Sequence, residues 1–200
     1  MMLGRAAGLV ALGLVGGCAF GNGIGTGVAR STEPVAGHDV SASMTSYYLD
    51  GYLTLGPFET ITGMALGSAR SRSRSADLTG AGADNHSSTH SLFYLGVGLP
   101  TATDRGLRLM PYVLYGVGAL GNDEILPADI KSQFEVGAEI GIFRLWGIKN
   151  LARHGFALRV AFLQIQGNLV DSETLSKVDT YTGRGMTFVL SWRTTRWRWF

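Results

Sequence analysis

The chain has 200 residues, of which 29 are glycine, and its formal net charge at pH 7 is +2. This length suits a single domain, and a charge so close to zero argues against a nucleic-acid-binding protein. Glycine costs about 1 kcal/mol at each helix position relative to alanine, so the composition disfavours a helical bundle. Abundant glycine, 10% aromatic residues and only 16% charged residues favour a β-sheet with one face toward lipid.

Residues 1–17 have the features of a cleaved secretory signal. Arg5 is their only charge, and the mostly apolar stretch 6–17 is too short to cross a membrane as a helix. The sequence LVGGC at positions 14–18 resembles the lipobox of bacterial lipoproteins. That resemblance implies cleavage before Cys18 and acylation of this cysteine, which would tether a single domain of residues 18–200 to a membrane.

Cys18 is the only cysteine in the chain. A lone cysteine excludes a disulfide within the chain, and its acylation would also exclude a thiol catalyst and a cysteine-based metal site. We therefore expect no metal and no cofactor.

Eight segments alternate apolar with polar or small residues at the period of a β-strand. In the clearest, 134–143, Phe134 and Val136 share one face while Glu135 and Glu139 share the other. In chain order the segments are 21–30, 41–55, 58–70, 91–99, 107–119, 134–143, 156–166 and 185–193. Their lengths approach or exceed the ~9–11 residues that a tilted strand needs to cross a bilayer.

Short and long connections alternate between these segments. Long outer loops and short periplasmic turns are typical of an even-stranded barrel whose two ends lie in the periplasm. The expected periplasmic turns are 56–57, 100–106 and 147–154, and the expected outer loops are 31–40, 71–90, 120–130 and 167–183. Two points stay open: Asp50-Gly51 is a second candidate for the first turn, and 21–30 is either the first strand or a glycine-rich tether.

The lipobox, the eight alternating segments and the long outer loops together resemble the small outer-membrane barrels of the OmpA and OmpX class, in lipoprotein form. The resemblance implies an all-β, eight-stranded antiparallel up-and-down barrel, located in the bacterial outer membrane and monomeric. It also implies contact with the outer-membrane assembly machinery, since 186–192 has apolar residues at every second position and the chain ends in Phe200. Arg196 and Arg198 depart from that terminal pattern.

Charged residues occur on the faces that would point into the barrel. Isolated burial costs several kcal/mol per ion, so we expect these residues to pair and to plug a bore that is just wide enough for side chains. A gated, narrow pore is the alternative. Glu135 and Glu139 are ~13 Å apart along one strand, too far for a paired-carboxylate mechanism. The expected interior network comprises Asp50, Glu59, Arg108, Glu135, Glu139, Arg159 and Arg184.

Arg70, Arg72 and Arg74 recur at every second position near the expected outer rim. Arginine binds phosphate bidentately, so these residues are candidates for contact with lipopolysaccharide. Tryptophan and arginine near the C-terminus have the character of interfacial anchors. These are Arg193, Trp197, Arg198 and Trp199.

The leading hypothesis is a non-enzymatic barrel lipoprotein with a structural, adhesive or narrow-pore role. A lipid-modifying enzyme is the second hypothesis, with His86 or His90 beside a serine. His86, His90 and Asp84 lack a defined metal-ligand spacing, so no metal site is expected. A tethered, lipocalin-like carrier is the third hypothesis, and it predicts that Phe134, Val136 and Ile140 line a cavity.

Overall fold

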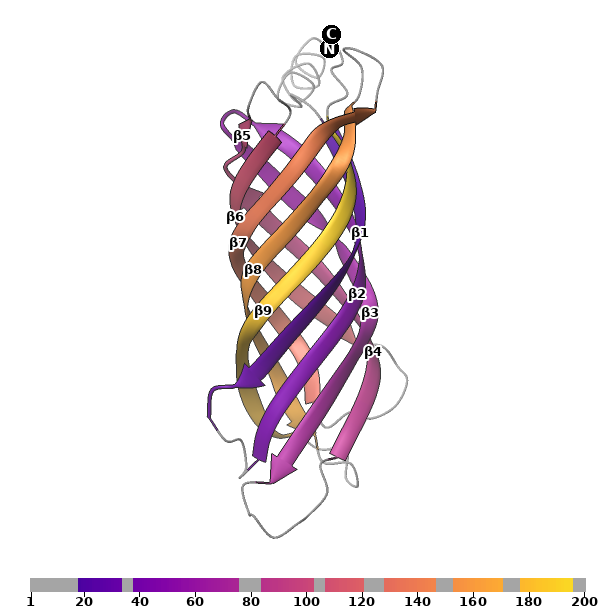
Figure 1. Ribbon diagram of the computed structural model, residues 1–200. Coiled ribbons are helices and arrows are strands. Elements are labelled where there is room, and N and C mark those ends of the chain that lie inside the picture. The colour runs from indigo at the N-terminus through magenta and orange to yellow at the C-terminus, as the bar shows by residue number, and fades with distance from the viewer. Residues whose placement is uncertain are drawn as a thin grey trace, which may run out of the picture.

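A computed structural model describes residues 18–33, 38–75, 84–102, 107–120, 128–146, 153–170 and 177–195. They form one antiparallel sheet that closes into a tall barrel of strongly tilted strands (Figure 1). None of these residues belongs to a helix long and apolar enough to cross a membrane. The strands are β1 (Cys18–Ser31), β2 (His38–Leu55), β3 (Phe58–Ser75), β4 (Asp84–Gly98), β5 (Thr101–Ala102), β6 (Leu107–Leu120), β7 (Ala128–Trp146), β8 (Arg153–Val170) and β9 (Lys177–Thr195).

The barrel closes because its first and last strands pair. The sheet order is β4-β3-β2-β1-β9-β8-β7-β6-β5, and β4 also pairs with β6. The two-residue β5 only extends the connection between β4 and β6, so the wall consists of eight long strands, each bonded to its neighbours along the chain. This confirms the predicted eight-stranded up-and-down antiparallel barrel.

Both open points at the N-terminal end of the barrel are resolved. Residues 21–30 belong to a full strand, β1, which pairs with β2 and β9 along its length. The first turn is Gly56-Pro57, between the paired residues Leu55 and Phe58. Gly56 has φ of 60°, a conformation that disfavours side chains with a Cβ and so suits glycine.

The strands extend further than their apolar patterns. Strand β3 runs to Ser75 and β4 starts at Asp84, so the connection is much shorter than the expected 71–90 loop. The expected 120–130 and 167–183 loops shrink in the same way, because β7 starts at Ala128 and β9 at Lys177. Pairing to at least one neighbouring strand holds these polar segments in the sheet, although they carry no alternating signal.

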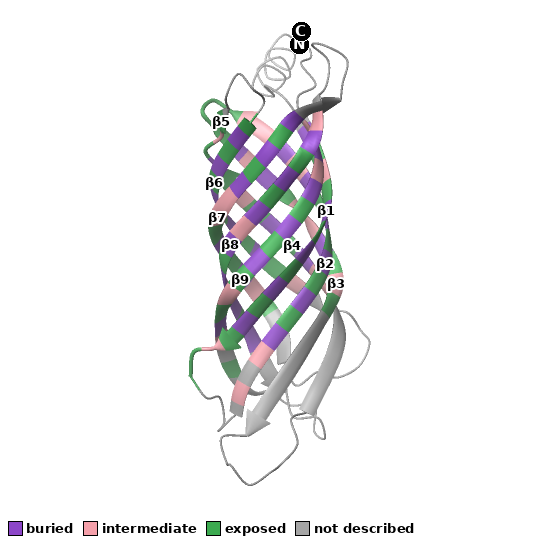
Figure 2. Cartoon of the chain, viewed as in Figure 1, coloured by how far each residue is buried: buried purple, intermediate pink, exposed green. Residues whose placement is uncertain are grey.

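The two faces of each strand differ sharply in burial (Figure 2). Large apolar side chains point outward and charged side chains point inward: Val136 is 44% exposed and Glu139 is fully buried. This orientation contradicts the lipocalin-like hypothesis, because Phe134, Val136 and Ile140 lie on the outer surface rather than around a cavity.

The outward apolar side chains form a continuous band, which we call the apolar belt. It covers about seven to eleven residues of each long strand, close to the length that crosses a hydrocarbon core. Its limits are Phe20 and Val28 on β1, Leu55 and Tyr47 on β2, Phe58 and Leu66 on β3, Phe93 on β4 and Leu99 directly after it, Leu107 and Val117 on β6, Ile142 and Phe134 on β7, Phe156 and Phe162 on β8, and Trp192 and Met186 on β9.

Strand β1 supplies almost no inward side chains, because glycine occupies most of its inward positions. A Cβ on Gly25 would lie 2.7 Å from both Tyr48 Cε2 and Val189 Cγ2. These glycines therefore leave room for the tyrosines of β2, which fill the interior together with charged residues from other strands.

Candidate functional site

The interior holds a chain of ion pairs toward the end of the barrel at which β1 starts and β9 ends. Arg108 on β6 lies 2.7 Å from Glu59 on β3, and Arg193 on β9 contacts both Glu59 and Glu139 on β7. The Arg193 guanidinium also lies over the ring of Tyr52, 3.4 Å from its centroid. Each guanidinium thus has at least one carboxylate partner, as burial requires.

A second cluster, centred on Asp50, continues this chain. Arg159 on β8 lies 3.1 Å from Asp50, and Tyr94 on β4 donates a hydrogen bond to the same carboxylate. The hydroxyl of Tyr52 lies 3.1 Å from Asp50 and 3.3 Å from Glu139, so it connects the two clusters. Seven of the eight long strands contribute to this network, and we call it the interior network.

Glu135 stands apart from these pairs. It is 2% exposed, and its carboxylate accepts hydrogen bonds from Gln133 and from Tyr112, the latter at 3.1 Å. Among the described residues it forms no ion pair. Among the described side chains, the buried charged residues are Asp50, Glu59, Glu135 and Glu139 against Arg108, Arg159 and Arg193, which leaves one carboxylate in excess within this set.

Six of the seven residues expected in the interior are buried there, and Arg184 is not. Arg184 shares the outward phase of Met186 and Phe188 on β9, so it is exposed on the outer wall, and its placement inside was wrong. Arg193, expected at the membrane interface, is fully buried instead. The sequence contained this signal, because Arg193 has the same phase as the inward-facing Val189 and Ser191.

Several other expected residues cannot be placed in this way. Residues 1–17, and with them the expected signal, lie outside the described residues, as do Trp197, Arg198 and Trp199. Cys18, Asp84 and His86 are in strands, and so are Arg70, Arg72 and Arg74, but their side chains are outside the described set.

One histidine of the enzyme hypothesis lies beside a serine. His90 Nε2 is 2.9 Å from Ser46 Oγ, across Gly67 of the intervening strand. Both side chains point into the barrel, and His90 Nδ1 has no hydrogen-bond partner among the described residues. The pair therefore has the residue types of a nucleophile and a base, but no described carboxylate orients the imidazole.

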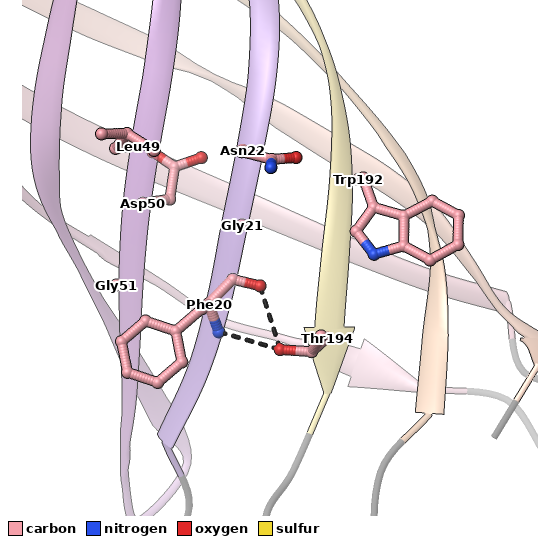
Figure 3. Close-up of a pocket in the computed structure, with 8 residues that line it drawn as sticks. All are labelled: Phe20, Gly21, Asn22, Leu49, Asp50, Gly51, Trp192 and Thr194. Carbon is pink, nitrogen blue, oxygen red and sulfur yellow. Dashed lines mark hydrogen bonds between the residues drawn. The ribbon is translucent and has the colours of Figure 1, made fainter.

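A groove crosses the outer wall where β1 lies between β2 and β9 (Figure 3). Thr194 bonds both the N–H and the carbonyl of Phe20, at 3.2 and 3.1 Å, and so continues the β1–β9 contact past its last ladder pair. The lining is mostly apolar, and it also includes the side-chain amide of Asn22. The residues around the groove are Phe20, Gly21, Asn22, Leu49, Asp50, Gly51, Trp192 and Thr194.

Within the described parts of the chain, no three His, Cys, Asp or Glu side chains are grouped so as to hold a metal ion. No protein-family model matches the chain, and no curated protein sequence matches it. Among solved structures, Neisserial surface protein A (NspA) is similar over 88% of this chain and 97% of its own, with 10% identity and a TM-score of 0.42. The β domain of the Bordetella autotransporter Brka is similar over 88% and 98%, with 7% identity and a TM-score of 0.29.

Proposed function

We propose that this chain is an outer-membrane β-barrel lipoprotein with a closed interior and a structural or adhesive role. The observation that carries the proposal is the pairing of an apolar outer belt with a buried, charged interior. An apolar band exposed to water over the whole circumference of a barrel would be unstable as a monomer, whereas in lipid it matches the hydrocarbon core.

The interior network supports a plug rather than a pore. Its members come from seven strands, and each is at most 9% exposed. An eight-stranded barrel has a bore just wide enough for its own side chains. Paired arginines and carboxylates at this density leave ions no wide aqueous path.

The ends of the strands support one orientation. The start of β1, the end of β9 and the Gly56-Pro57 turn all lie at the same end of the barrel (Figure 1). That end carries the interfacial aromatic Trp192, which packs edge-on against Phe156. We place this end in the periplasm, where an acylated Cys18 would enter the inner leaflet. The polar extensions of β2, β3 and β4 then project from the cell surface, where an adhesive role is available to them.

Single cysteines test the membrane placement. In native membranes we expect Val136→Cys to react with a lipid-soluble maleimide and Ser43→Cys, beyond the belt, to react with a water-soluble one. Leu163→Cys, which is fully buried in the interior, is the matched control and should react with neither reagent. Reaction of Val136→Cys with the water-soluble reagent would refute a lipid-facing belt.

The anchor has a separate test. Cells grown with labelled palmitate should incorporate the label into the wild-type chain and not into a Cys18→Ala variant. Equal labelling of both chains would remove the lipoprotein part of the proposal and leave the barrel intact.

The contact between Ser46 and His90 favours a lipid-modifying enzyme as a second candidate. A biotinylated fluorophosphonate, which reacts with activated serine, distinguishes the two candidates. The closed structural barrel predicts no labelling above that of a Ser46→Ala variant. Labelling that disappears in both Ser46→Ala and His90→Ala would establish an activated serine and favour the enzyme.

A further inference from the structure

Among the described side chains of the outer wall, one pair of arginines lies directly beyond the apolar belt. On seven long strands, the structure describes the first outward polar side chain past the belt, at the end away from Gly56. These side chains are three serines, a threonine, a glutamine and two arginines. The arginines, Arg30 on β1 and Arg184 on β9, are register partners in adjacent strands. Both are exposed, and both lie next to the last belt residues of their strands, Val28 and Met186.

This pair is electrostatically unfavourable without a counter-charge. Directly opposed residues of an antiparallel ladder have Cβ atoms about 4.5–5.5 Å apart, and like charges there are destabilising. Asp39 on β2 lies 2.8 Å from Arg30 and neutralises one guanidinium. Arg184 forms no ion pair with any described residue. A net positive charge is thus held where the belt meets the aqueous phase.

We propose that Arg30 and Arg184 bind a phosphate group on the headgroup of a lipid in the leaflet farther from Gly56. Guanidinium groups bind phosphate through two parallel hydrogen bonds, and two of them at adjacent strand positions can share one phosphate. A lipid whose acyl chains lie against Val28 and Met186 brings its phosphate to this level. The proposal rests on the membrane placement proposed above.

The backbone register aligns further arginines of the sequence with this pair. In the ladder, Ser41 of β2 lies between Arg30 of β1 and Arg72 of β3, and Asp39 is opposite Arg74. From the sequence, we expect Arg72 and Arg74 to contact lipopolysaccharide. The backbone register places them on β3, with only β2 between them and Arg30. A phosphorylated glycolipid with more than one phosphate suits this row better than a lipid with a single phosphodiester.

The test is thermal unfolding in vesicles. Wild-type protein is reconstituted in phosphatidylcholine, with and without phosphorylated lipid A, and unfolding is followed by loss of β-sheet circular dichroism. We expect lipid A to raise the unfolding temperature of the wild type and of Lys131→Gln, an exposed control on β7. The double variant Arg30→Gln/Arg184→Gln should lose most of that rise, and Asp39→Asn should keep it.

The outcomes separate the two proposals. An equal rise in the wild type and the double variant, or no rise in the wild type, overturns the lipid-phosphate site. The same rise from inorganic phosphate in pure phosphatidylcholine also overturns it, because the site would then bind free anions. If external protease digests the wild type in all of these vesicle preparations, the chain does not insert. That result refutes the membrane placement instead. Single Arg30→Gln and Arg184→Gln variants repeat the test if the double variant fails to fold.

Discussion

At the scale of single residues, Glu135 and Glu139 show how position in the interior decides the role of a carboxylate. They share one strand and one face, and both are at most 2% exposed. Glu139 contacts Arg193, whereas Glu135 has only the neutral donors Gln133 and Tyr112. A glutamine can therefore replace Glu135 more easily than it can replace Glu139.

We therefore predict unequal effects of Glu139→Gln and Glu135→Gln. Removing one partner of a buried ion pair typically costs about 3–5 kcal/mol, and Arg193 keeps Glu59, so we expect Glu139→Gln to lose about 2–3 kcal/mol. Glu135→Gln should change the free energy of unfolding by less than about 1 kcal/mol. Urea unfolding of both variants in detergent micelles measures the difference, and equal losses would contradict this account of the interior network.

The sequence predicts six interior charged residues because their strand phases are clear. It also contained the information to place Arg193 inside and Arg184 outside, since each follows the phase of its strand. What the sequence does not contain is the pairing itself. The partners in each ion pair come from different strands, and only closure of the barrel brings Glu59 of β3 to the Arg193 guanidinium of β9.

At the scale of elements, the glycines of β1 are required by the close approach of its neighbours. A Cβ on Gly23 would lie 2.6 Å from the Leu190 carbonyl oxygen and 2.8 Å from Ser191 Cα, and neither backbone atom can move without shifting β9. A Cβ on Gly51 meets nothing nearer than the Thr62 hydroxyl at 3.3 Å. The glycine pattern that made 21–30 look like a tether is thus a packing requirement.

We predict that Gly23→Ala destabilises the barrel by about 1–3 kcal/mol, because overpacking strains the surrounding backbone. Gly51→Ala is the matched control and should stay within about 1 kcal/mol of wild type. The readout is the fraction of unboiled protein that migrates as a compact, folded band after heating in mild detergent. Equal heat resistance of the two variants would contradict the packing argument.

The polar ends of β2, β3 and β4 mark the limit of prediction at this scale. Their sequences carry serine, arginine, asparagine and histidine without an apolar phase, so a period-two search ends at the belt. The ladder nevertheless continues, for example with Ser73 of β3 paired to Val40 and to Asp84. Backbone pairing to β3, a property of the sheet, holds the ends of β2 and β4 as strands.

At the scale of the whole molecule, the proposed plug predicts that the barrel conducts no ions. We expect no stepwise current when the wild-type chain is inserted into a planar bilayer in KCl at neutral pH, because a plug formed by the interior network would fill the bore. Parallel samples must show the compact band on unboiled gels, so that silence reflects a plug and not failed insertion. Discrete steps of constant size would show that the narrow-pore alternative is right.

The pairing of β1 with β9 also sets the order of folding events. Phe20 bonds to Thr194 across 174 positions of the chain, and such distant contacts form slowly. Until β9 pairs with β1, both edges of the incomplete sheet carry unpaired N–H and carbonyl groups that a lipid environment does not tolerate. Partly folded barrels should thus depend on an external partner to shield these edges. A chain truncated before β9 would lose the closed state altogether, and not simply one strand of it.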